Sequence, residues 1–139
     1  MTDQTYTGGC ACGAIRYTAT GAPVAELHCQ CQHCQKRSGT GHASFAVFAG
    51  EGAVSVTGEP TTWRQKGDSG NEKIHAFCPT CGAPVMVRFA ADPGITALHV
   101  GSLDAPEKFN PTLATYTSRA LPWDALGAGL TLLPKGPGG

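Results

Sequence analysis

The chain has 139 residues, with ten basic and ten acidic side chains and a formal net charge of zero. This length fits one domain with a single core. The absence of a basic excess argues against nucleic acid as a partner, and the absence of charge runs argues against a membrane surface. Nineteen glycines and ten prolines favour a fold rich in turns over a helical one.

The N-terminal residues, beginning Met1-Thr2-Asp3-Gln4, show neither the basic region nor the apolar region of a signal peptide. The longest apolar run is much shorter than a membrane span. We therefore expect a cytoplasmic, reducing location, where clustered cysteines serve as metal ligands more often than as disulfides.

Short segments of alternating apolar and polar residues recur along the chain, separated by turns that contain glycine or proline. After an extended lead-in at 6–9, strands are predicted at 15–19, 24–29, 44–49, 54–57, 61–65, 72–77, 84–89, 95–100 and 112–116. One helical turn is expected at 35–39, with Cys34 at its start, and Trp63 and Trp123 are expected in the core. Many short strands predict a mainly β sandwich or barrel-like domain over residues 1–126, followed by a flexible tail at 127–139.

All seven cysteines fall into three tight groups. Cys10 and Cys12 form one pair, Cys78 and Cys81 form a second, and Cys29, Cys31 and Cys34 form a triplet. We prefer to combine the two pairs into one four-thiolate zinc site, which would connect distant parts of a small β domain. Spacing alone also allows Cys10 and Cys12 to pair with Cys29 and Cys31, and an iron–sulfur cluster is a weaker alternative.

The triplet would then hold a second ion through three protein ligands. Residues i and i+2 of an extended chain share a face, so Cys29 and Cys31 point the same way, and a turn brings Cys34 back to them. A tetrahedral zinc with three ligands keeps one position open, which is typical of catalytic sites, whereas His33 as a fourth ligand would make the site structural. Three thiolates donate much charge to the ion, which favours binding and activating a substrate thiol over hydrolysis.

Several polar residues near the cysteines could have either a functional role or an ordinary structural or solvent-exposed one. Lys36 and Arg37 would suit recognition of a substrate carboxylate, although two solvated charges on a helical turn are slightly favoured on general grounds. His42 and His75 could transfer a proton or could be hydrogen-bonded structural histidines. The structural reading is favoured for His99, which lies in an apolar strand.

Three motifs make the sequence resemble one known family. These are Gly8-Gly9-Cys10-Ala11-Cys12-Gly13, His28-Cys29-Gln30-Cys31-Gln32-His33-Cys34 with Ser38-Gly39, and Phe77-Cys78-Pro79-Thr80-Cys81-Gly82. With Gly101-Ser102-Leu103-Asp104 and Leu121-Pro122-Trp123, they resemble the glutathione-dependent formaldehyde-activating enzyme (GFA) family, also called the centromere protein V family, over roughly residues 6–124.

The resemblance implies an Mss4-like β-tent fold with two zinc ions per chain, one structural and one catalytic. Cys10, Cys12, Cys78 and Cys81 match the structural ligands, and Cys29, Cys31 and Cys34 match the catalytic ligands. It also implies a zinc-dependent carbon–sulfur lyase or synthase similar to S-(hydroxymethyl)glutathione synthase, whose partners are a small thiol such as glutathione and an aldehyde.

The sequence departs from the family pattern at Gln30, His75, Ala114 to Tyr116 and Ala120, positions that we expect near the substrate. Two other hypotheses therefore stand beside the enzyme. The protein would be a non-catalytic zinc-binding module that captures a thiol or a protein partner, or a redox enzyme that uses the Cys29 and Cys34 thiols. The sequence does not specify the thiol, the aldehyde or the oligomeric state.

Overall fold

The structure is a computed structural model that describes residues 4–67 and 69–136. Strands dominate it, as the alternating segments predict. In chain order they are β1 (Thr5–Gly9), β2 (Arg16–Thr20), β3 (Ala25–Cys29), β4 (Ala43–Ala49), β5 (Val54–Thr57), β6 (Thr61–Lys66), β7 (Glu72–Phe77), β8 (Pro84–Phe89), β9 (Asp92–His99), β10 (Leu113–Thr115) and β11 (Thr131–Leu132). The helices are α1 (Gln32–Ser38) and three 3₁₀ turns at Val100–Ser102, Pro106–Lys108 and Thr117–Arg119.

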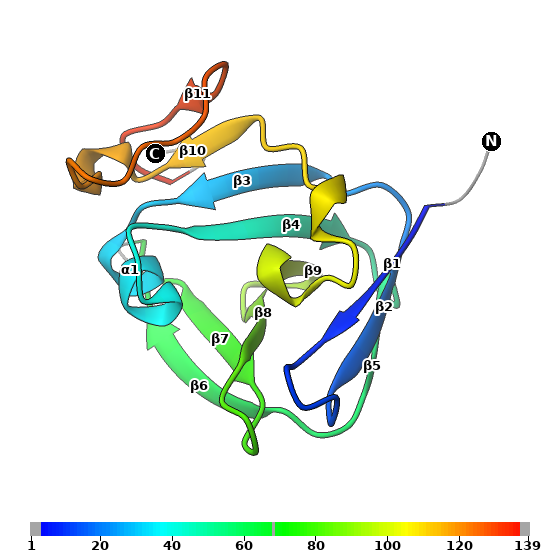
Figure 1. Cartoon of the computed structure of the whole chain (residues 1–139). Coiled ribbons are helices and arrows are strands. Elements are labelled where there is room, and N and C mark those ends of the chain that lie inside the picture. The colour runs from blue at the N-terminus through cyan, green and yellow to red at the C-terminus, as the bar shows by residue number, and fades with distance from the viewer. Residues whose placement is uncertain (1–3, 68, 137–139) are drawn as a thin grey trace.

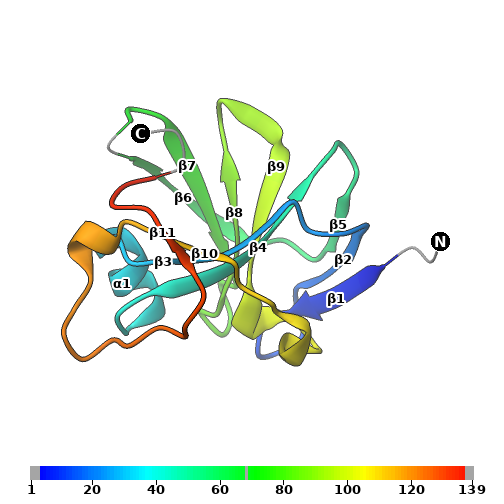
Figure 2. The same ribbon diagram turned by 90° about the horizontal axis from the view of Figure 1, so that it is seen from above.

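The strands form two sheets. A small sheet has the order β1-β2-β5, and a large sheet has the order β11-β10-β3-β4-β9-β8-β7-β6. Most neighbours are antiparallel, but β10 runs parallel to both β3 and β11. Figure 1 shows the small sheet on one side of the molecule and α1 on the other, and Figure 2 shows β6 to β9 standing steeply against β3 and β4. This arrangement confirms the mainly β prediction.

The large sheet has a buried cluster on each face, because side chains alternate along its strands. On β4, Ala46 and Phe48 face one cluster, while Ala43 and Phe45 face the other. The first cluster fills the space toward the small sheet and includes Tyr6, Ile15, Tyr17, Met86, Leu98, Cys10 and Cys78. The second includes Val87, Ala97, Cys29, Cys31 and Cys34. Thus the pair cysteines and the triplet cysteines belong to different faces of one sheet.

Helix α1 begins earlier than the sequence suggests. Cys31 is its N-cap and accepts the backbone N–H of Cys34 at 3.3 Å, while Gly39 ends the helix with a φ of 75°. The prediction that Cys34 starts a turn at 35–39 was therefore wrong by one turn, because a cysteine sulfur takes the capping role usually given to Ser or Asp.

The segment after residue 126 contributes to the sheet. Strand β11 pairs with β10, and the backbone N–H groups of Tyr116 and Thr117 donate to the carbonyls of Lys135 and Leu133. The flexibility of the predicted tail stays a prediction, and its last residues, 137–139, lie outside the described part of the chain. No helix among the described residues is long and apolar enough to cross a membrane.

The prediction that both tryptophans lie in the core was wrong. Trp63 is 50% exposed and Trp123 is 65% exposed. Trp63 lies on edge strand β6, where its ring packs between the Arg37 guanidinium, 4.9 Å from the ring centre, and the His75 ring. On an edge strand, an aromatic ring can be stabilised by contacts with a cation and a neighbouring ring while much of its surface stays exposed.

Candidate metal centres and the adjoining cleft

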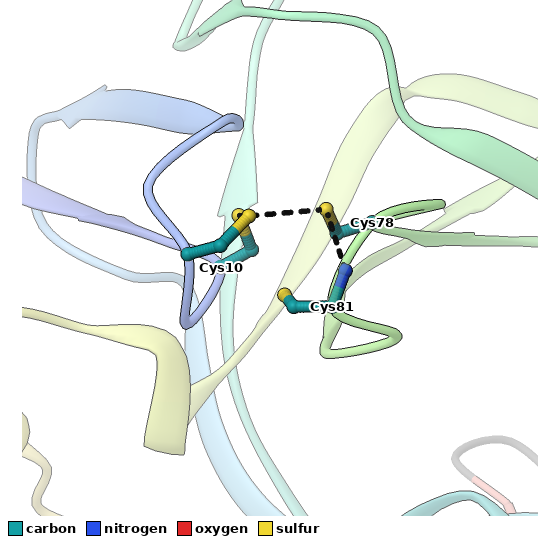
Figure 3. Close-up of side chains that lie close together, drawn as sticks. Cys10, Cys78 and Cys81 are labelled. Atoms are coloured by element: carbon teal, nitrogen blue, oxygen red, sulfur yellow. Dashed lines mark hydrogen bonds between the residues drawn. The ribbon is translucent and has the colours of Figure 1, made fainter.

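Four cysteine sulfurs from the two pairs converge at one end of the first core cluster. The ligand atoms of Cys10, Cys12, Cys78 and Cys81 all lie within 4.8 Å of one another. Figure 3 shows Cys10 on the turn after β1 facing Cys78 and Cys81 on the turn after β7. The two turns come from different sheets, so a shared ion would join the sheets. Cys10 and Cys78 are buried, whereas Cys12 and Cys81 are exposed.

The sulfur separations fit a tetrahedral ion. Cys12 Sγ lies 3.7 Å from both Cys10 Sγ and Cys78 Sγ. Four sulfurs at about 2.3 Å from a zinc ion are about 3.8 Å apart in a regular tetrahedron. Disulfides require about 2.05 Å between sulfurs, so the four cysteines are free thiols that could hold one ion together.

The backbone around Cys78 and Cys81 supports negatively charged sulfur. Cys78 Sγ accepts the N–H groups of Thr80 at 3.3 Å and Cys81 at 3.4 Å. Gly82 follows with a φ of 77°, a value that other residues adopt at a cost, and its N–H donates to the Cys78 carbonyl at 2.8 Å. Backbone N–H groups of Ala83 and Cys12 lower the pKa of Cys81 to about 6. The backbone N–H groups of this turn therefore favour the thiolate form of Cys81.

The triplet forms the second centre, on the opposite face of the large sheet. Cys29 is the last residue of β3, Cys31 caps α1 and Cys34 lies in its first turn, and all three are buried. Their sulfurs lie within 4.8 Å of one another, in a group that does not include His33. Hydrogen bonds from Cys29 and then Cys34 lower the pKa of Cys31 to about 2, and the same contacts raise the pKa of Cys34. The group thus concentrates negative charge on one sulfur, which a cation would neutralise.

A small cleft opens beside Cys31. Its volume is about 80 Å³, and its walls are Cys31, Gln32, His33, Gly67, Lys73, Tyr116 and Arg119. Ligand pockets usually measure about 300–1,000 Å³, so this cleft suits one end of a ligand whose remainder lies along the surface. Tyr116 has a φ of 54°, and within residues 4–67 and 69–136 it is the one non-glycine residue in the left-handed region. Such strained residues often occur at functional sites.

The structure places several predicted residues away from this cleft. Lys36 is exposed and does not line it, and Arg37 packs over Trp63. His75 and His99 are buried, and the cost of burying charge lowers the pKa of each to about 4. His42 pairs with Asp124 on the other face of the sheet, beside a second cavity of about 490 Å³.

Sequence reasoning missed Lys73 and Arg119, which line the cleft from distant parts of the chain. Among the departures from the family pattern, Ala114 is buried and Ala120 is exposed, and neither lines the cleft; Tyr116 does. Gln30 is 2% exposed and bonds to Asp124, so it also faces away from the cleft.

The fold and the two thiol clusters define a mainly β protein whose cysteines could hold metal ions at two centres. A comparison with family models assigns the family: the model described as "Glutathione-dependent formaldehyde-activating enzyme" matches residues 5–119, and the chain belongs to the GFA family. The family resemblance of the sequence is therefore confirmed.

Among solved structures, a crystal structure of a Rhodobacter sphaeroides protein, a structural genomics target, is similar to this chain. The two chains are 20% identical, with a TM-score of 0.53 over 70% of this chain and 87% of the other. At this identity the likeness extends to the fold alone.

Proposed function

We propose that the protein is a zinc-dependent carbon–sulfur lyase or synthase, similar to S-(hydroxymethyl)glutathione synthase, that joins a thiol to an aldehyde at the three-cysteine centre. The observation that carries the proposal is the convergence of three buried thiols, without a fourth ligand among the described residues, beside a cleft. The family supports glutathione and formaldehyde as the substrates to test first. In this assignment Cys10, Cys12, Cys78 and Cys81 hold a structural zinc.

In the proposed reaction the substrate sulfur forms a bond to the aldehyde carbon. A zinc ion held by Cys29, Cys31 and Cys34 would supply an open position where a thiol loses its proton. The electron pair of the carbonyl π bond moves to the oxygen, which takes up a proton, and the product is a thiohemiacetal. The reverse sequence cleaves the carbon–sulfur bond.

The chain's own residues would bind and orient the substrate. Lys73 and Arg119 bring two positive charges to the cleft and suit the carboxylates of glutathione, a role that the sequence allowed for Lys36 and Arg37 without favouring it. The Tyr116 side chain closes one wall of the cleft and packs against the triplet's cluster. These contacts would hold the thiol with its sulfur toward Cys31.

The test is a count of zinc per chain together with the rate of exchange between formaldehyde and its glutathione adduct, followed by NMR. The wild type should hold two zincs and accelerate the exchange above the spontaneous rate. Cys31→Ser should keep the fold, retain one zinc and lose the acceleration, while Lys36→Ala serves as a surface control. An unchanged rate in Cys31→Ser would refute the catalytic role. Glutathione binding without acceleration in the wild type would support the non-catalytic thiol-binding module instead.

A further inference from the structure

Gln30 lies between two of the proposed zinc ligands, and the protein holds it at three points. Its side chain is almost fully buried, and its Nε2 donates to Asp124 at 3.3 Å. Its backbone N–H donates to the Thr115 carbonyl at 3.0 Å, and its carbonyl accepts Gln35 Nε2 at 3.0 Å. The peptide that carries Cys29 and Cys31 is therefore fixed on both sides of Gln30.

Asp124 is the outermost member of this arrangement. Its side chain is 7% exposed, and its two carboxylate oxygens lie 2.8 and 2.9 Å from His42 Nδ1. Because an ionised carboxylate can only accept, the imidazole proton is on Nδ1. A Cβ at position 41 would overlap the Asp124 side chain, so Gly41 permits the close approach. The carboxylate is thus held by His42 and Gln30 and lies close to Gly41.

The Asp124 carboxylate is not part of the group of ligand atoms that the three cysteines form. Gln30 follows β3 and His42 precedes β4, so each is the direct neighbour of a residue of the triplet's cluster, Cys29 and Ala43, and neighbouring residues of an extended chain point to opposite faces. Asp124 contacts both of them on that opposite face. The direct hydrogen-bonded route from Asp124 to the centre is the side chain of Gln30, which lies between Cys29 and Cys31.

We infer that Asp124 is a positioning residue for the three-cysteine centre, and that it acts through Gln30 to set the separation of the Cys29 and Cys31 sulfurs. This inference rests on the proposed function, because it takes the triplet as a zinc site. Hydrogen-bonded partners outside the ligand shell commonly change metal affinity by about 10- to 100-fold when removed. The three-cysteine centre should depend on Asp124, and the four-cysteine centre should not.

The experiment follows zinc release from the full-length, zinc-loaded protein against increasing concentrations of the chromogenic chelator 4-(2-pyridylazo)resorcinol. Cys31→Ser identifies the release that belongs to the triplet. Asp124→Ala should lower the chelator concentration that half-empties the triplet by about tenfold or more, without changing the four-cysteine centre. Asp124→Asn, which keeps the size of the side chain, should shift it in the same direction by a smaller factor. Asp104→Ala is the matched control, since this carboxylate pairs with Arg16 away from the triplet.

A double-mutant cycle tests the route through Gln30. Gln30→Ala should weaken zinc retention by a similar factor, and adding Asp124→Ala to it should have little further effect, because coupled residues are not additive. Unchanged retention at the triplet in both folded Asp124 variants would overturn the inference alone. A wild type that holds one zinc would overturn the proposed function and, with it, this inference.

Discussion

Replacing Cys78 by serine should destabilise the fold much more than replacing Cys31. Cys12 and Cys78 are 66 residues apart in sequence, and a shared ion would close that loop. Cross-linking a loop of this length contributes about 4 kcal/mol in the chain-entropy treatment used for disulfides. Because single domains are stable by about 5–15 kcal/mol, this contribution is a large share of the total.

The zinc of the triplet should contribute much less to stability. Cys31 and Cys34 are only three residues apart, so their ion closes no long loop. Three thiols so close in sequence also bind zinc in the unfolded chain, which reduces the stabilisation of the native state. We therefore expect Cys31→Ser to remain close to the wild type, within about 1 kcal/mol, since little unfolded-state entropy is at stake.

The measurement is urea unfolding at a fixed free zinc concentration, followed by far-ultraviolet circular dichroism. Tryptophan fluorescence is a poor probe here, because Trp63 and Trp123 are half exposed or more in the folded state. If the free energy of unfolding of Cys78→Ser lies within about 1 kcal/mol of the wild type, or if Cys31→Ser loses as much, the loop-closure reasoning is wrong.

Three further predictions follow from particular contacts. Gly58→Ala should lower the free energy of unfolding by about 2–4 kcal/mol in a urea titration, because the residue has a left-handed φ and its new Cβ would overlap the Ala14 carbonyl oxygen. Gly52→Ala is the control, since Gly52 is also left-handed but has no neighbour within reach, and it should cost about 1 kcal/mol. Equal losses in the two variants would contradict the close approach at Gly58. In steady-state kinetics, Lys73→Ala and Arg119→Ala should each raise the KM for glutathione about 5- to 10-fold with little change in kcat, because each removes one positive charge from the cleft. An unchanged KM would show that these two residues do not contact the substrate. Burial lowers the pKa of His99 to about 4, so between about pH 4 and 6.5 the unfolded chain binds a proton that the folded chain does not. The free energy of unfolding should therefore fall as the pH decreases through that window, and it should fall less steeply for His99→Gln. Identical slopes for the two proteins would exclude this histidine as a cause.

Local patterns in the sequence predicted much of the fold and the grouping of the thiols. Alternation marked the strands, and the short spacings of the seven cysteines marked the two pairs and the triplet. The preference for joining the two pairs agrees with the convergence of Cys10, Cys12, Cys78 and Cys81, although spacing alone left another pairing open. The strands and the three cysteine groups were predictable because neighbouring residues determine them, whereas the joining of the two pairs depends on how distant strands are arranged.

Features that depend on distant strands were not predictable in the same way. Lys73 reaches the cleft from β7, and Arg119 reaches it from the segment after β10, so their proximity to Cys31 depends on the strand order. The exposure of Trp63 depends on β6 being an edge strand. Lys36 and Arg37 were considered because they follow the triplet in sequence, but neither of them lines the cleft.

The parallel pairing of β10 with β3 has a consequence for biosynthesis. A ribosome makes all four thiols of the four-cysteine group before β8, β9 and β10 exist. The triplet thiols are made before Cys78 and Cys81, but the wall formed by Tyr116 and Arg119 and the Asp124 contact to Gln30 come from residues 116–124. A nascent chain can thus present both thiol groups before the cleft beside Cys31 is complete, because that cleft also needs Tyr116 and Arg119.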